Sequence, residues 1–173
     1  MTATKAIPVK RLLSAQAYQL IDREIAKYPA DQKQSAVMGA LTIAQDEAGW
    51  VSPAVIEDVA DYLSMPPIAV YEVATFYNMY NLEEVGTWKI GVCTCLPCAL
   101  REGDKAGEYL KQKLGIDFGE TTPDGRFTLI ETECLGSCAD APICLINDKR
   151  VESFMDNAKL DALIDELRNK ERH

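Results

Sequence analysis

The first half of the chain has the apolar spacing of helices. Between residues 14 and 81, aliphatic and small side chains recur every three or four positions, as they do on the buried face of an amphipathic helix. Prolines, glycines and serines divide this stretch into four segments. The pattern predicts helices over residues 14–27, 31–49, 52–66 and 67–77, and the short turns between them favour a small helical bundle.

Three of these predicted helices begin with residues suited to cap a helix. Ser14 and Ser52 each precede an apolar segment, and Pro53 has the fixed φ of a first helical position. Asp31, followed three residues later by Gln34, resembles a capping box. We therefore expect side-chain caps at all three starts.

Beyond residue 85 the spacing of apolar positions changes. Short runs rich in β-branched and aromatic residues alternate with longer segments of helical period. The elements predicted here are strands near residues 88–92, 127–133 and 143–146, and helices over residues 103–114 and 156–167.

We expect an α+β fold in three parts. Residues 1–13 have few apolar anchors and are predicted to form a flexible N-terminal tail. Residues 14–85 are predicted to form the helical bundle, and residues 86–173 a small mixed α/β domain.

Charge and hydropathy disfavour two classes of partner. The formal net charge is −9 at pH 7, and the first 85 residues carry 6 basic and 11 acidic side chains. Such a surface repels a phosphate backbone, so we expect no nucleic acid, and a helix-turn-helix role for the first half is disfavoured. Membrane insertion is not expected either, because no apolar run approaches roughly 18 residues. The first eight residues lack the apolar run of a signal peptide, which predicts a cytoplasmic chain.

All six cysteines lie in the second half of the chain. The cytoplasm keeps thiols reduced, so metal binding or redox chemistry is the first interpretation. Cys93 and Cys98 follow one predicted strand, and Cys134 and Cys138 follow the next. Loops at strand ends can lie side by side, and these two would then supply four thiolates, the ligand set of a [2Fe–2S] cluster. Gly136 would let backbone N–H groups approach the cluster sulfurs.

Other chemistry fits some of the same cysteines. Four thiolates also form structural zinc sites, although zinc modules usually use two C-x2-C pairs, and only one pair here has that spacing. That pair, Cys95 and Cys98, also has the spacing found in thioredoxin-like dithiol enzymes. A dithiol enzyme, however, would leave the cysteines of the second loop unexplained. Cys95 is an alternative ligand to Cys93, which we favour. Cys144 lies inside a predicted strand and is expected to be a buried, inert thiol.

The only histidine, His173, is the last residue of the sequence. A Rieske centre and histidine-based catalytic triads or zinc motifs are therefore excluded. No phosphate-binding glycine motif is present. A [2Fe–2S] cluster transfers single electrons and cannot accept a hydride, so a nicotinamide donor requires a flavin on another chain. We expect one component of a larger redox enzyme.

Several segments together carry a family resemblance. The longest are VYEVATFYNMYN at residues 70–81, VCTCLPCAL at 92–100 and ECLGSCADAP at 133–142; shorter ones are Tyr28-Pro29, Gly49-Trp50 and residues 114–116, 119–124 and 146–148. With these segments the chain, from residue 14 to residue 170, resembles the thioredoxin-like [2Fe–2S] subunits of NADH:quinone oxidoreductase, respiratory complex I. In bacteria this component is called the E subunit.

The resemblance implies a fold, a ligand set and partners. The fold is an N-terminal helical bundle followed by a thioredoxin-like α/β [2Fe–2S] ferredoxin domain. The implied partners are the FMN- and NADH-binding flavoprotein subunit and other peripheral-arm subunits, so FMN and NAD would be bound by a partner. The chain would be an electron-transfer subunit, not catalytic alone, and peripheral to the inner membrane through the complex. The implied ligands are the family cysteines, here Cys93, Cys98, Cys134 and Cys138.

Two questions stay open at this point. Related subunits serve NAD-linked hydrogenases and formate dehydrogenases, which the sequence separates poorly from complex I. Phe76, Tyr77 and Tyr80, with Trp88 nearby, are expected to pack in the core at the junction of the two domains, or alternatively some of them contact the flavin subunit. Four apolar residues flank the cysteines and are expected to exclude water from the cluster: Leu96, Pro97, Leu135 and Pro142.

Overall fold

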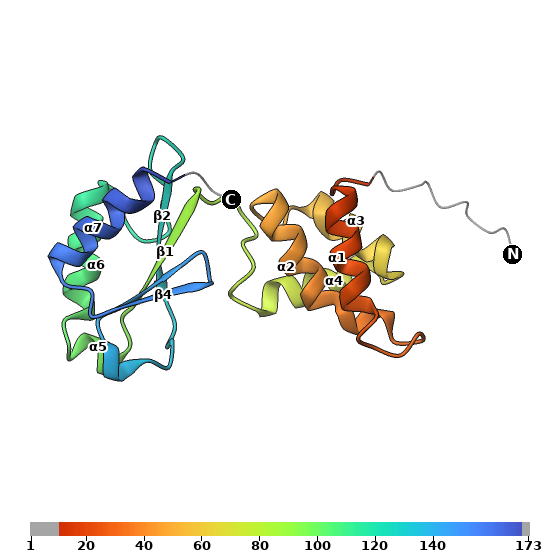
Figure 1. Cartoon of the computed structure of the whole chain (residues 1–173), viewed down its shortest axis with the longest axis horizontal. Coiled ribbons are helices and arrows are strands. Elements are labelled where there is room, and N and C mark those ends of the chain that lie inside the picture. Colours follow the sequence, from red (N-terminus) through yellow and green to blue (C-terminus); the bar gives the residue numbers. More distant parts are fainter. Residues whose placement is uncertain (1–10, 171–173) are drawn as a thin grey trace, which may run out of the picture. The chain divides into compact units, whose positions relative to one another are not determined.

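The structure, a computed structural model, describes residues 11–170 and divides into two compact units between Glu84 and Val85. The first unit is helical, and the second combines helices with a four-stranded sheet (Figure 1). This is the α+β class that the sequence predicts. Within the described residues, no helix is long and apolar enough to cross a membrane.

From residue 11, where the described part begins, the first unit contains four α-helices, as predicted. Ser14 caps the first of them by accepting a hydrogen bond from the backbone N–H of Ala17 at 3.2 Å. Ser52 caps the third in the same way, with the N–H of Val55 as donor at 3.2 Å. The elements are α1 (Ala15–Ile25), the 3₁₀ turn η1 (Lys33–Ala36), α2 (Val37–Ala48), α3 (Pro53–Leu63) and α4 (Pro67–Phe76).

The capping box predicted from Asp31 and Gln34 is wrong. The chain enters α2 through η1, and neither η1 nor α2 has a side-chain cap. Instead Lys33, the first residue of η1, donates a hydrogen bond to the backbone carbonyl of Tyr62 on α3. A contact with another helix therefore takes the place of the local cap.

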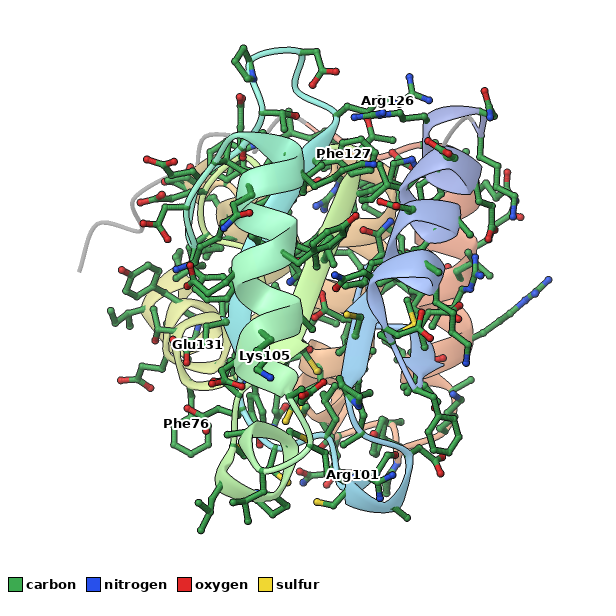
Figure 2. All side chains as sticks on the ribbon, turned by 90° about the vertical axis from the view of Figure 1, so that its left-hand side faces the viewer. Phe76, Arg101, Lys105, Arg126, Phe127 and Glu131 are labelled. Carbon is green, nitrogen blue, oxygen red and sulfur yellow. The ribbon has the colours of Figure 1, made fainter. Side chains whose placement is uncertain are left out.

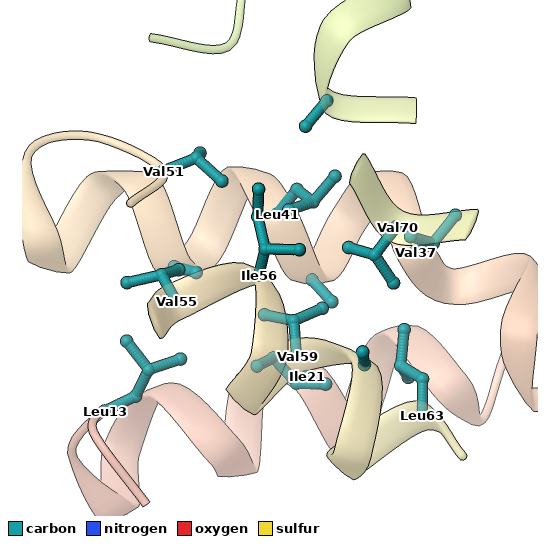
Figure 3. Packing of buried hydrophobic residues seen from close by; sticks show 14 of the residues in the cluster. Leu13, Ile21, Val37, Leu41, Val51, Val55, Ile56, Val59, Leu63 and Val70 are labelled. Carbon is teal, nitrogen blue, oxygen red and sulfur yellow. The ribbon is translucent and has the colours of Figure 1, made fainter. Parts of the chain in front are cut away.

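One apolar stripe from each helix forms the core of the first unit (Figure 3). Its largest members, such as Ile21 of α1, Leu41 of α2 and Leu63 of α3, are almost fully buried. Burying a side chain of this size stabilises the fold by about 1.5–3 kcal/mol relative to exposing it. Burial of these apolar stripes therefore stabilises the helical bundle.

The three aromatic residues near the end of α4 have different surroundings. Tyr80 is buried, and its hydroxyl donates a hydrogen bond to the carbonyl of Met38 at 2.9 Å, so the core interpretation is confirmed there. Phe76 is 79% exposed and Tyr77 is also exposed, so for these two it is wrong. The exposed face of α4 carries Ile68 and Tyr71 as well.

Residues 11–13, which were predicted to belong to the flexible tail, are attached to the helical unit. Arg11 Nη1 lies 2.9 Å from Asp58 Oδ1, and the backbone N–H of Leu12 donates to Asp58 Oδ2 at 3.0 Å. Leu13 is buried in the core. The reason is Asp58, a fully buried carboxylate on α3 that requires donors. The rest of the predicted tail, residues 1–10, lies outside the described residues.

The second unit is built on a sheet with the strand order β2-β1-β3-β4. β1 pairs in parallel with β2 and antiparallel with β3, and β3 pairs antiparallel with β4. The first three strands were predicted. β1 is internal, which is why five of its six residues are buried. The bounds are β1 (Trp88–Cys93), β2 (Phe127–Thr132), β3 (Ile143–Ile146) and β4 (Arg150–Ser153).

Two predicted helices cover one face of this sheet. α6 (Gly103–Leu114) and α7 (Asn157–Arg168) lie side by side on it (Figures 1 and 2) and share a core with β1, β2 and β3. Asp156 caps α7 by accepting a hydrogen bond from the N–H of Lys159 at 2.9 Å. Three short elements were not predicted: β4, the single helical turn α5 (Leu96–Ala99) and the 3₁₀ turn η2 (Cys138–Asp140).

Candidate metal centre

The pairing of β1 with β2 brings the two cysteine loops together. The strands are parallel, and Cys93 at the end of β1 is in register with Thr132 at the end of β2. Both strands therefore leave the sheet at the same edge. Because β1 lies between β2 and β3, the connection over residues 133–142 crosses the end of β1. The second loop therefore crosses the end of β1 where Cys93 lies.

The first loop is a tight turn that contains two buried cysteines. Cys93 is 1% exposed and Cys98 is fully buried. Between them, α5 is closed by a hydrogen bond from the N–H of Cys98 to the carbonyl of Cys95 at 2.8 Å. Ala141 and Ile143, from the far side of the second loop, pack against both buried cysteines.

The second loop places its cysteines nearer to solvent. Cys134 is exposed, and Cys138, at the start of η2, is half-buried. Gly136 between them has φ +73°, a left-handed conformation that favours glycine. A Cβ added at Gly136 would meet no protein atom within 4 Å, so its backbone conformation is what favours glycine here, and the approach of backbone N–H groups to the cluster sulfurs stays a prediction.

Two contacts hold the two loops to each other, and a third joins the first loop to β2. The backbone N–H of Leu135 lowers the pKa of the Cys93 thiol and so acts on that sulfur from the second loop. The guanidinium of Arg101 donates to the carbonyl of Ala139 at 3.1 Å. The hydroxyl of Thr94 hydrogen-bonds to the carboxylate of Glu131, at the end of β2. The loops therefore form one structural unit.

The thiols of the two loops affect one another electrostatically. Burial alone would raise the pKa of Cys93, but hydrogen bonds from the backbone of Cys95 and Leu135 and from the Cys98 thiol lower it. Burial raises the pKa of Cys98 to about 12, helped by its hydrogen bond to Cys93 and by repulsion from the charges of Cys93, Cys138 and Cys134. Several thiolates can coexist at this edge only if a cation compensates them.

The chemistry of the two cysteine pairs suits a two-iron cluster. Among residues 11–170, no three Cys, His, Asp or Glu side chains are grouped closely enough to hold a metal ion, so the four candidate ligands are not gathered into one formed site. A [2Fe–2S] cluster instead takes two cysteines on each of two irons, so it requires two pairs from neighbouring loops. Cys93 and Cys98 belong to one loop and each shifts the pKa of the other, and Cys134 and Cys138 belong to the other loop.

The two remaining cysteines differ in position. Cys95 is half-exposed and hydrogen-bonds to Cys93 through its side chain. Cys144 is fully buried in β3, as predicted, and burial raises its pKa to about 12. It lies opposite Val92 in the sheet and shares the core under α6 and α7. Successive residues of a strand point to opposite faces, so Cys144 and Cys93 lie on different faces.

The apolar residues that flank the cysteines do not all exclude water. Leu135 packs beside Cys93 and is half-buried, and Pro142 is also half-buried. Leu96, however, is 73% exposed and its neighbour Pro97 is exposed too, so the expectation is wrong for these two. Leu100, one turn further on, is 78% exposed. The chain thus presents apolar side chains to solvent at the edge of the site.

Sequence reasoning missed two residues that shape this site. Arg101 was one charged residue among many, and nothing in the sequence indicated its contact with the second loop. Gly103 begins α6, and a Cβ added there would lie 2.8 Å from the carbonyl oxygen of Cys93 and 2.9 Å from that of Cys98. A glycine within a predicted helix was the only available signal.

Comparison with known proteins agrees with this geometry. The sequence profile of the family described as thioredoxin-like [2Fe–2S] ferredoxin matches residues 21–168. The E subunit of NADH-quinone oxidoreductase from Rickettsia conorii is 46% identical over 151 residues, which cover 87% of this chain and 90% of that protein. The same subunit of Rickettsia bellii is 48% identical over 84% of this chain and 87% of that protein.

More distant relatives cover less of their own length. NADH dehydrogenase [ubiquinone] flavoprotein 2, mitochondrial, of Dictyostelium discoideum is 40% identical over 86% of this chain and 60% of that protein. A crystal structure of NAD+-reducing [NiFe]-hydrogenase in the H2-reduced state matches 78% of this chain with a TM-score of 0.68 and 23% identity, but only 22% of the hydrogenase chain. That similarity shows the fold alone. The profile match and the two Rickettsia relatives decide the family: the chain belongs to the thioredoxin-like [2Fe–2S] ferredoxins, and its cofactor is a [2Fe–2S] cluster.

Proposed function

We propose that this chain is the [2Fe–2S] electron-transfer subunit of an NADH-quinone oxidoreductase, with Cys93, Cys98, Cys134 and Cys138 as the cluster ligands. One observation carries the proposal: two cysteine loops meet at one edge of the sheet. The Rickettsia relatives, matched over nearly their whole length, support the assignment to that enzyme.

The role of this chain is to bind a one-electron centre and to set its reduction potential. When bound, the cluster supplies one-electron transfer and no hydride chemistry. The burial of Cys93 and Cys98 keeps water from two of the proposed ligands. The backbone N–H of Leu135 stabilises negative charge on the sulfur of Cys93, a kind of contact that raises a cluster's reduction potential.

The proposed partner is the FMN- and NADH-binding flavoprotein subunit of the same enzyme, together with other subunits of its peripheral arm. NADH gives up a hydride, so a flavin on a partner has to divide the electron pair before this chain can receive one electron. The exposed Leu96 and Leu100 beside the cysteine loops support a docking surface there. The chain would then be held at the inner membrane only through the complex.

A second candidate within the same class has a specific observation in its favour. The fold is also found in an NAD+-reducing [NiFe]-hydrogenase, so an equivalent subunit of such an enzyme, or of a formate dehydrogenase, is the alternative. The proteins that co-purify with the tagged chain from its own host decide between them. Quinone-reductase subunits support the first candidate, and hydrogenase or formate dehydrogenase subunits support the second.

The proposed ligand set is tested by metal analysis and spectroscopy of the reconstituted chain. We expect about two irons and two acid-labile sulfides per chain, with a [2Fe–2S] visible spectrum and an EPR signal in the reduced state. Serine at any one of the four proposed ligands should abolish or strongly alter both spectra. Cys95→Ser and Cys144→Ser are the matched controls and should keep them.

Two results would contradict this proposal in different ways. Zinc without iron or sulfide would replace the redox role with a structural metal module. Loss of the cluster in Cys95→Ser but not in Cys93→Ser would keep the function and change the ligand set.

A further inference from the structure

Arg101 links the two cysteine loops through its backbone and its side chain. Its backbone N–H donates a hydrogen bond to the carbonyl of Cys98 at 3.0 Å. Its Nη1 donates to the carbonyl of Ala139, the residue after Cys138, at 3.1 Å. Figure 2 shows Arg101 at the end of the second unit where the loops leave the sheet. One residue thus connects the last cysteine of the first loop with the residue that follows the last cysteine of the second.

The charge of Arg101 is not neutralised by a contact. Within residues 11–170 its guanidinium forms no ion pair, and its one side-chain hydrogen bond goes to a neutral carbonyl. The next cation along the chain, Lys105, is instead paired with Glu102 at 2.7 Å. The second loop also carries the carboxylates of Glu133 and Asp140, and within the described residues neither forms an ion pair with Arg101. Arg101 therefore contributes net positive charge beside the loops.

The charge of Arg101 would matter most when the cluster is reduced. A bound cluster would take up one electron with no bond formed or broken, and it would then carry one more negative charge. A cation nearby stabilises the more negative state, and the effect weakens with salt where the cation is exposed to solvent. Arg101 is exposed, so its electrostatic effect is screened in part.

Taking the proposed function and its ligand set as given, we propose that Arg101 is a positioning residue for the [2Fe–2S] cluster. It holds the loop of Cys138 against the loop of Cys98, and its positive charge favours the reduced state. The planar guanidinium suits this double role, because one N–H can bond to the carbonyl of Ala139 while the charge is kept.

The test compares three variants of the reconstituted full-length chain: Arg101→Gln, Arg101→Lys and Lys105→Gln. Iron and sulfide per chain are measured first, and the midpoint potential is then measured by EPR-monitored redox titration at low and at high ionic strength. Arg101→Gln should lower the potential while the iron content is retained. Arg101→Lys should stay close to the wild-type potential, and Lys105→Gln, which removes an already paired charge, should not shift it.

Salt dependence separates the charge effect from a purely structural one. The difference between wild type and Arg101→Gln should shrink at high ionic strength, which a change of loop packing alone would not cause. If Arg101→Gln loses iron, recovery of the cluster in Arg101→Lys supports the positioning role, and equal loss in both overturns it. An iron-loaded Arg101→Gln with the wild-type potential at low salt also overturns the inference. Neither result touches the proposed function, which is tested on the wild-type chain by its iron and sulfide content and by the proteins that co-purify with it.

Discussion

At the scale of single residues, Asp58 shows how one side chain orders a segment that lacks secondary structure. It is fully buried on α3 and accepts hydrogen bonds from the Arg11 guanidinium, the backbone N–H of Leu12 and the hydroxyl of Tyr18. Burial and the bond to Asp58 raise the pKa of Tyr18, so its hydroxyl remains a donor at neutral pH. The start of the packed unit therefore depends on one carboxylate.

We expect Asp58→Ala to lower the free energy of unfolding by about 2–4 kcal/mol, because it removes the buried acceptor that the N–H of Leu12, the hydroxyl of Tyr18 and the Arg11 guanidinium share. Urea unfolding followed by circular dichroism measures the loss. Asp61→Ala is the matched control: it removes the other partner of Arg11, at 2.8 Å, but on the surface. Its expected cost is below about 1 kcal/mol. An equal loss of unfolding free energy in the two variants would show that the hydrogen bonds of buried Asp58 stabilise the fold no more than the surface ion pair does.

At the scale of elements, the start of α6 is fitted to the first cysteine loop. Gly103 lies against backbone carbonyl oxygens of that loop, which cannot move aside as the end of a flexible side chain can. Gly107, one turn along the same helix, faces the Phe118 ring, and a Cβ added there would lie 2.9 Å from the tip of that ring. The two glycines thus differ in what a methyl group would meet.

Gly103→Ala should therefore disturb the site, whereas Gly107→Ala should not. We expect the first substitution to lower the free energy of unfolding of the second unit by about 1–3 kcal/mol, as overpacking does, and to reduce the iron bound per chain. In Gly107→Ala the ring can turn away, and alanine gains up to about 1 kcal/mol in helix propensity. Thermal unfolding and iron analysis of both variants check this. A Gly103→Ala chain with full iron and unchanged stability would show that α6 can shift at no cost.

Elements with local signals could be predicted from the sequence. Ser14, Ser52 and Asp156 each accept the hydrogen bond expected of a cap, and Gly115 ends α6 with φ +69°. The strand β4 and the turns η1, α5 and η2 could not be predicted, because they are too short for periodicity and depend on tertiary partners. Asp31 shows the limit of local signals, since a contact made by a different residue overrode a plausible cap.

The candidate site, too, has features that could be predicted from the sequence and features that could not. The spacing of Cys93, Cys98, Cys134 and Cys138 was visible in the sequence, since cysteine pairs after strands are a local pattern. The bond of Arg101 to Ala139 was not visible, because it spans 38 positions and exists only once β1 and β2 are paired in parallel.

At the scale of the whole molecule, the second unit presents an apolar surface where electrons would have to enter or leave. Leu96 and Leu100 lie on and just after α5, within three residues of the buried Cys98. Exposed leucines of this kind are typical of a surface that another protein covers. Under the proposed function, that protein is the flavoprotein subunit.

We therefore expect the double variant Leu96→Ser, Leu100→Ser to weaken binding to the flavoprotein subunit about tenfold or more, as the loss of central apolar contacts does. Its iron content and thermal stability should stay at the wild-type level. Leu20→Ser, which changes an exposed leucine of α1, is the control and should bind normally. Binding is measured by surface plasmon resonance or calorimetry. Unchanged affinity of the double variant would place the docking surface elsewhere.

The division between Glu84 and Val85 has a consequence for biosynthesis. All six cysteines lie beyond position 92, so the helical unit leaves the ribosome before any thiol does. Domains generally fold as units from the N-terminal end during translation, so the bundle can complete its core first. Delivery of iron and sulfide then becomes a late maturation step that concerns the nascent second unit alone, on a polypeptide whose first half is already folded.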